Sequence, residues 1–158
     1  MVDTVSELSE LSRKLNQKSD TLNEVITSTN EKLAKLKIGI EAWVSNIDES
    51  DPYNYEFEDG AGSTTVRAHD ETWLGYYRFE SSDNPKAGSG WELATKTVTL
   101  DAEGEIVDAG SPKPLLNRSR STRAKAMKLI PRLLDAIKQN AEELLRSIDE
   151  AEKAAKKL

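Results

Sequence analysis

TVSELSELSRKLNQKSDTLNEVITSTNEKLAKLKIGIEAWVSNI, residues 4–47 of this 158-residue chain, carries a seven-residue repeat of mostly apolar positions. Two series of residues recur in it every seven positions, and they are offset by three, as the a and d positions of a heptad are. The first series is Val5, Ser12, Ser19, Ile26, Leu33, Ile40 and Ile47, and the second is Leu8, Leu15, Leu22, Thr29, Leu36 and Trp43. Thr4 and Glu7 form a capping box. We predict a helix from about residue 4 to 46, roughly 65 Å long.

The C-terminal end of the chain repeats this pattern. One series is Ile130, Ile137, Leu144, Ala151 and Leu158, and the other is Met127, Leu134, Ala141, Ile148 and Ala155. This second helix is predicted to start near Ser119 or Ser121. Pro131 lacks a backbone donor and clashes with the preceding turn, so we expect a kink or short break there.

Two seams of similar length can pack on each other within one chain. In an antiparallel pairing, positions that sum to about 167 would meet. That register places Leu33 near Leu134 and Ile40 near Met127. An intermolecular coiled coil accounts for the same seams, so the pattern leaves open whether they pair within or between chains.

The middle of the chain has a different composition. Residues 48–117 hold seven of the eight glycines and four of the five prolines, and all nine aromatic residues lie between Trp43 and Trp91. Alternation and turn signals predict strands at residues 53–57, 64–68, 72–81, 92–100 and 105–109, with a polar loop at 82–90. Short connections between consecutive strands favour an antiparallel arrangement.

The predicted fold class is therefore α+β. Two long terminal helices pack as an antiparallel coiled-coil hairpin, joined by an antiparallel β-meander of about four to five strands. We expect one structural unit with three parts: an N-terminal heptad helix at 1–47, a β-rich head at 48–117 and a C-terminal heptad helix at 118–158.

Composition and motifs give no sign of catalysis. The chain has no cysteine, so thiol catalysis and thiolate metal sites are excluded. It has no HExxH motif, EF-hand loop, phosphate-binding loop or GxSxG elbow. His69, the only histidine, is followed by Asp70 and Glu71. Neighbouring side chains of a strand point to opposite faces, so this run is interpreted as surface rather than a metal or acid–base site. We predict no enzyme activity, no cofactor and no metal.

Charge is distributed unevenly along the chain, although the formal net charge is only -6. Residues 113–132 carry seven basic side chains and no acidic one, whereas residues 48–59 carry six acidic side chains and no basic one. The candidate contacts for an anion or a partner are Arg118, Arg120, Arg123, Lys125 and Lys128. The predicted hairpin would bring the two segments together, so we favour internal pairing over nucleic-acid binding.

The aromatic residues of the middle section suggest a second candidate surface. Alternation places Trp73, Tyr77 and Phe79 on one face of a strand, which we expect to be the core that packs on the helices. Tyr76 lies on the opposite face. Tyr76 and Trp91 are therefore the candidate residues of an exposed head surface that binds a small ligand or a peptide.

These observations favour a non-enzymatic protein–protein interaction or scaffold protein with a coiled-coil stalk and a β head. One alternative is a nucleic-acid-associated protein that uses residues 113–132, and another is a small-ligand-binding head. The expected partner is a protein, and a homo-oligomer is one form it can take. The polar N-terminus and the lack of a long apolar run predict no signal peptide and no membrane association, hence a cytoplasmic protein.

Overall fold

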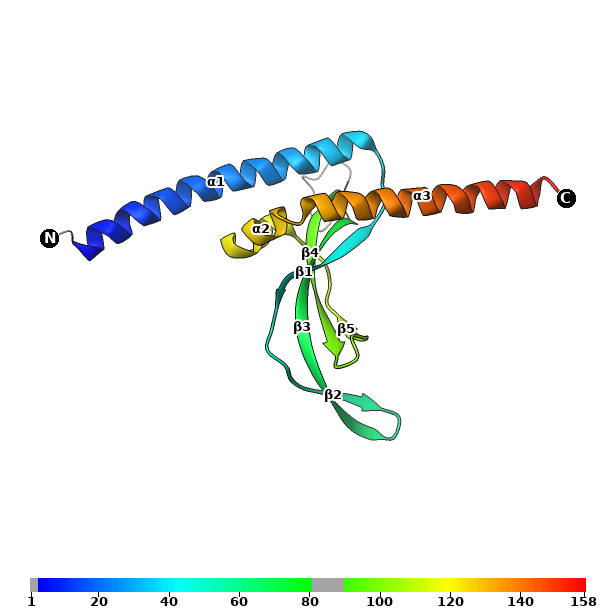
Figure 1. The fold of residues 1–158 in the computed structure, drawn as a ribbon, viewed down its shortest axis with the longest axis horizontal. Coiled ribbons are helices and arrows are strands. Elements are labelled where there is room, and N and C mark those ends of the chain that lie inside the picture. Colours follow the sequence, from blue (N-terminus) through cyan, green and yellow to red (C-terminus); the bar gives the residue numbers. More distant parts are fainter. Residues whose placement is uncertain (1–2, 81–89) are drawn as a thin grey trace.

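The computed structural model describes residues 3–80 and 90–158, and it is an α+β fold. Its helices are α1 (Thr4–Leu36), the short 3₁₀ helix η1 (Leu115–Asn117), α2 (Arg120–Met127) and α3 (Ile130–Ala155). Its strands are β1 (Ala42–Glu49), β2 (Tyr53–Asp59), β3 (Gly62–Arg78), β4 (Trp91–Asp101), β5 (Ile106–Ala109) and β6 (Lys113–Pro114). The helices lie on one side of the molecule and the β2–β3 hairpin extends away from them (Figure 1).

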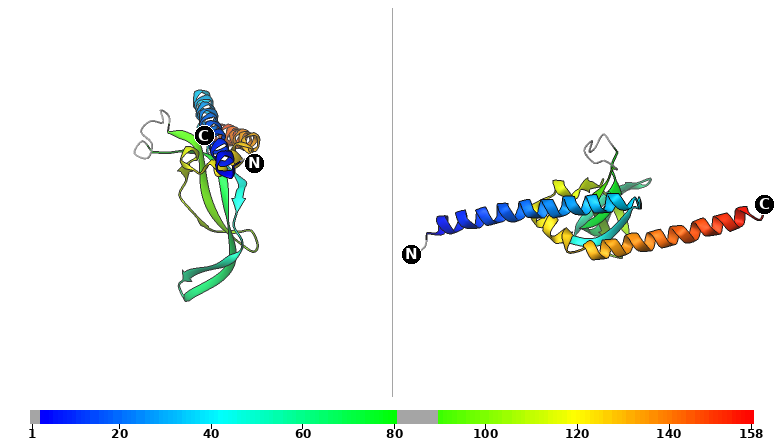
Figure 2. Two further views of the ribbon diagram at one scale, coloured as in Figure 1. Left: turned by 90° about the vertical axis from the view of Figure 1, so that its left-hand side faces the viewer. Right: turned by 90° about the horizontal axis from the view of Figure 1, so that it is seen from above.

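The predicted antiparallel coiled-coil hairpin is wrong. Helices α1 and α3 run in the same general direction and are staggered along it, as both views from the side and from above show (Figures 1 and 2). Helix α1 packs mainly on α2 and β4, whereas α3 packs mainly on β1 and β3. Each long helix therefore buries apolar residues near only one of its ends, α1 in its C-terminal half and α3 near its start, and no long helical hairpin occurs among the described residues.

Helix α1 also ends earlier than the heptad pattern predicted, at Leu36 rather than near residue 46. Lys37 adopts the left-handed conformation that commonly ends a helix, with φ of 52°, and its backbone N–H donates to the carbonyl of Ala34. Gly39 also has a positive φ, and the chain then enters strand β1. Trp43 and Ile47 continue the heptad numerically, but they belong to a strand. The first turn of α1 is capped by Asp3, whose side chain accepts from the N–H of Val5.

The predicted start and break of the C-terminal helical region are both confirmed. Ser119 is the N-cap of α2, where its hydroxyl oxygen accepts from the backbone N–H of Thr122. Helix α2 ends at Met127, and α3 begins at Ile130 with Pro131 in its first turn. Proline is tolerated there because the first N–H groups of a helix have no partner within it.

The sheet is antiparallel, as predicted, with six strands instead of about four to five. Strands β3 and β4 form its centre and pair from Ala68↔Asp101 to Arg78↔Trp91. Strands β1 and β2 follow one another along the free edge of β3, while β5 and β6 pair with the free edge of β4. The sequence interpretation missed β1 and β6. The polar loop predicted at residues 82–90 falls almost entirely outside the described residues.

The core lies between the helices and one face of the sheet. Leu74 and Tyr76 of β3 and Leu93 of β4 are buried in it, together with residues of all three α-helices. The helical contributors are Ile26, Leu33, Ala126, Leu133 and Ile137. None of the described helices combines the length and the apolar character needed to span a membrane.

Candidate functional site

The N-terminal part of α1, residues 4–18, projects beyond the body of the molecule and is called the N-arm (Figure 1). The residues of α1 that are buried in the core, Ile26 and Leu33, lie further along the helix. The N-arm nevertheless keeps the heptad spacing of apolar residues. Its large apolar side chains are between 54% and 71% exposed and are Val5, Leu8, Leu11 and Leu15.

The C-terminal part of α3, residues 141–155, projects on the opposite side and is called the C-arm (Figure 2). Helix α3 buries Leu133 and Ile137 near its start, where it packs on the sheet. Beyond them the same apolar stripe continues but is largely uncovered by the residues that the structure describes. Leu144, Leu145 and Ile148 of the C-arm are between 45% and 61% exposed.

A groove at the base of the N-arm extends its apolar stripe into the body. Its volume is about 560 Å³, and it lies between α1 and the first turn of α2. Leu15 and Leu22 line it from α1, and Ser121 and Ala124 line it from α2. Contiguous exposed apolar surface of this kind typically marks an interaction site in a soluble protein.

The predicted basic contact residues are divided between the surface and internal contacts. Arg123 is 8% exposed and its guanidinium donates to the side-chain oxygen of Asn23 and to the carbonyl of Ser119. Arg120 donates to Asn16 of α1 at 3.3 Å. Among the described residues, one ion pair joins the basic and acidic segments, Lys125 to Asp48 at 3.4 Å. Lys128 is exposed and Arg118 is half-buried.

The predicted head surface at Tyr76 and Trp91 is not an exposed face. Tyr76 is 1% exposed and lies in the core, and burial raises the pKa of its hydroxyl. Its ring stacks on that of the half-buried Trp91 with centroids 5.3 Å apart. A cavity of about 270 Å³ beside the two rings is also lined by Leu33 and Arg78. The face that packs on the helices is thus that of Tyr76, the reverse of the predicted orientation for Trp73 and Tyr77.

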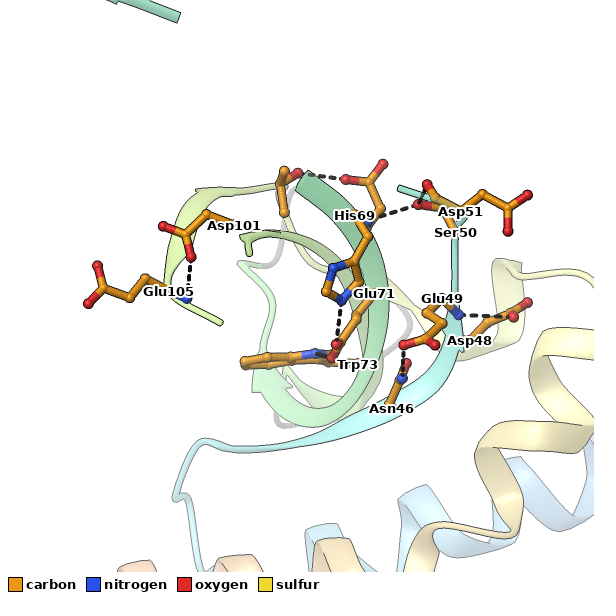
Figure 3. Close-up of polar contacts among 12 residues, drawn as sticks. Asn46, Asp48, Glu49, Ser50, Asp51, His69, Glu71, Trp73, Asp101 and Glu105 are labelled. Atoms are coloured by element: carbon orange, nitrogen blue, oxygen red, sulfur yellow. Dashed lines mark hydrogen bonds and ion pairs between the residues drawn. The ribbon is translucent and has the colours of Figure 1, made fainter. Parts of the chain in front are cut away.

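On the other face of the sheet, a histidine and two carboxylates come together (Figure 3). His69 and Glu71 are neighbours on one face of β3, and the His69 Nε2 lies 2.9 Å from Oε2 of Glu71. Glu49 of β1 is the direct cross-strand partner of Glu71. One ligand atom from each residue lies within 4.8 Å of the others. Asp70 points elsewhere, as strand alternation requires, and accepts from Tyr53 and Thr99.

The surroundings of this cluster fix the orientation of both carboxylates. The Trp73 Nε1 donates to Oε1 of Glu71 at 2.9 Å, and the Asn46 Nδ2 donates to Oε2 of Glu49 at 3.1 Å. Imidazole and carboxylate are ligand types that Zn²⁺ accepts, with three protein ligands in a typical catalytic site. Both oxygens of Glu71 already face a donor or the histidine, so contacts within β3 by themselves account for the position of this carboxylate.

Sequence reasoning missed two features of these sites. Glu49 joins His69 only because β1 pairs with β3, and residues 42–47 had been assigned to the helix. The exposure of the arms was missed because the predicted hairpin packed the apolar series of the N-terminal helix on that of the C-terminal helix. The signal that could have suggested the arms was present, since Ser12 and Ser19 weaken an intramolecular seam where Leu8, Leu11 and Leu15 lie.

Comparison with protein-family models, with curated proteins and with solved structures finds no match to this chain.

Proposed function

We propose that this chain is a non-enzymatic protein–protein interaction protein that binds helices of a partner through its N-arm and C-arm. The observation that supports this most strongly is the exposure of seven large apolar side chains along two projecting helices. They recur at the spacing with which an amphipathic helix presents one face to another helix. Single exposed leucines are ordinary on protein surfaces, but two continuous stripes are not.

The β-sheet serves in this proposal as the rigid body that holds the two arms in place. Helix α1 is anchored by Ile26 and Leu33, and α3 by Leu133 and Ile137. Anchoring at one end leaves the other end of each helix available along its length. We further propose a cytoplasmic location, which is supported by the absence of cysteine in the sequence.

The experiment compares tagged wild-type chain with two arm variants, L8D/L15D and L144D/I148D, in crosslinking and affinity capture from the native cell. These four side chains are exposed, so aspartate should leave the fold intact while removing the apolar stripe. Ile106→Asp is the matched control, because Ile106 is an equally apolar side chain, 56% exposed, on β5 away from both arms.

We expect both arm variants to lose the captured protein, whether another polypeptide or a differently tagged copy of this chain, and Ile106→Asp to retain it. Circular dichroism should show the same helix content for all four proteins. Equal capture by the wild type and both arm variants would refute the proposal.

A further inference from the structure

We infer that the partner of each arm is the opposite arm of a second copy of this chain, paired antiparallel, so that two chains form a two-fold symmetric dimer. This inference rests on the proposed function of the arms and names their occupant. The N-arm of one chain would lie along the C-arm of the other, and the same contact would occur a second time on the other side of the dimer.

The charges of the two arms are complementary in the antiparallel direction. Residues 3–10 carry Asp3, Glu7 and Glu10 and no basic residue, and residues 153–158 carry Lys153, Lys156 and Lys157 and no acidic one. Further along, residues 11–18 carry three basic side chains and no acidic one. Residues 142–152 carry five acidic side chains and one basic side chain. Antiparallel pairing therefore brings the acidic start of the N-arm to the basic end of the C-arm, and the basic half of the N-arm to the acidic stretch that begins at Glu142.

A parallel pairing of the arms would reverse this match. The acidic start of the N-arm would lie beside Glu142 and Glu143, and its basic half would approach Lys153 and Lys156. Like charges placed together at an interface are unfavourable by several kcal/mol, whereas complementary charges fix both the orientation and the register. The charge pattern thus selects the antiparallel direction.

Side-chain sizes support one antiparallel register. When the sum of paired positions is about 160, large residues mostly meet small ones, as close packing in a helical seam requires. The layers of this register are Val5 with Ala155, Leu8 with Ala151, Ser12 with Ile148 and Leu15 with Leu144. It also places Glu7 opposite Lys153 and Lys18 opposite Glu142.

The arrangement of the arms on the body allows both contacts to form at once. The N-arm and C-arm project in opposite directions from a helical layer that has the sheet on one side (Figures 1 and 2). A two-fold axis perpendicular to these helices, which passes beside the body rather than through it, would reverse the second copy along the helix direction. Each N-arm would then lie on the same side as the partner's C-arm. Such an isologous interface closes the assembly at two chains.

The directions of the two arms exclude their pairing within one chain. They point away from each other, and each continues a rigid helix whose other end is fixed in the core. Only a second copy offers a C-arm beside the N-arm. Strands β2 to β5 lie away from the arms and take no part in this contact.

The test uses two charge-reversal variants of the full chain, E7K and K153E, studied singly and as an equimolar mixture. The register places these two side chains opposite each other, and both are exposed in the single chain. In the first variant both members of this pair are basic, and in the second both are acidic. E56K/E58K, which reverses two exposed charges on β2, is the matched control. Sedimentation velocity and native mass spectrometry measure the fraction of dimer.

We expect the wild type and E56K/E58K to have twice the 17.5 kDa mass of the chain. Each arm variant alone should dissociate, with a dimer dissociation constant raised at least about tenfold. The mixture should regain the dimer as a heterodimer, because each N-arm then meets a C-arm of opposite charge. A parallel pairing or a dimer built elsewhere would not give this rescue.

A monomeric wild type would overturn the inference, and so would dimers formed by each arm variant alone as readily as by the wild type. These results are distinguishable from failure of the proposed function. If the wild type is monomeric but L8D/L15D still loses a captured partner, the arms bind a different protein and only the inference fails. If capture is also unchanged, the proposed function fails as well.

Discussion

The indole of Trp43 lies directly over the backbone of Gly75, its cross-strand neighbour in the β1–β3 pair. A Cβ atom placed on Gly75 would lie 2.2 Å from Cε3 of Trp43, far inside contact distance. The ammonium of Lys96 lies over the same indole, 4.2 Å from the ring centroid. Trp43 therefore contacts both a strand backbone and a cation, and only glycine at position 75 leaves room for its ring.

Gly75→Ala should lower the free energy of unfolding by about 1–3 kcal/mol, because the added methyl group forces the indole and β1 to shift. Urea denaturation followed by tryptophan fluorescence measures this. Gly60→Ala is the control, since no atom lies within 4 Å of the Cβ that it would add. Equal urea midpoints for the two variants would contradict the packing argument.

Arg123→Ala should destabilise the chain by about 1–3 kcal/mol, because it removes a buried side chain and the hydrogen bond that its guanidinium donates to Asn23. This hydrogen bond connects α2 to α1, and the same guanidinium also donates to the Ser119 carbonyl at the start of α2. Lys128→Ala, at an exposed position of the same basic segment, should change stability by less than about 0.5 kcal/mol. Thermal unfolding followed by circular dichroism compares the two. Similar losses would mean that charge, rather than the buried contacts, determines the effect.

The two glutamates of the histidine cluster should respond in opposite directions. Glu71→Ala removes the acceptor of Trp73 and should cost about 1 kcal/mol in the free energy of unfolding. Glu49→Gln removes one of two like charges that face each other across the strands and should raise the urea midpoint slightly. Urea denaturation of both variants and the wild type, at low salt with a chelator present, measures these changes. A loss of stability in Glu49→Gln would show that its charge is needed there.

Stability should fall at alkaline pH through Tyr53. Its hydroxyl donates to Oδ1 of Asp70 at 2.7 Å, and this hydrogen bond is the main cause that raises the pKa of Tyr53 in the folded chain. The stabilisation is fully present below the unfolded pKa of about 10 and is lost as pH rises through the higher folded value. The stability difference between the wild type and Tyr53→Phe should therefore shrink in this range. Parallel pH profiles in urea denaturation would contradict the assignment.

Lys37→Gly should stabilise the chain, by up to about 1 kcal/mol, because Lys37 occupies the left-handed region at the end of α1 and glycine does so without strain. Lys35→Gly, two residues earlier and inside the last turn, should instead lose about 0.5–1 kcal/mol. Chemical denaturation of the two single variants measures these opposite signs. Destabilisation by both would indicate that the lysine side chain at position 37 contributes more than its backbone conformation.

Local features of the fold could be predicted from the sequence because they depend on near neighbours. The seven-residue repeat predicted a helix at each end of the chain, the serines at 119 and 121 predicted where the C-terminal helical region starts, and Pro131 predicted its break. Alternating residues and turns predicted β2, β4 and β5, and they predicted β3 as two separate strands of an antiparallel sheet. Each of these signals lies within a few residues along the chain, where backbone sterics and hydrogen bonding act directly.

Tertiary structure alone decided what each helix packs against. A heptad pattern indicates that one face of a helix is apolar, but it does not indicate which surface covers that face. The helices were therefore predicted correctly, whereas their packing as an intramolecular hairpin was wrong. Trp43 and Ile47 continue the seven-residue spacing but lie in strand β1, which pairs with β3. Pairing of β1 with β3 brought Glu49 to His69, and anchoring of α1 and α3 at staggered positions left the N-arm and C-arm exposed. These are contacts between residues distant in sequence, and they follow from the shape of the whole core.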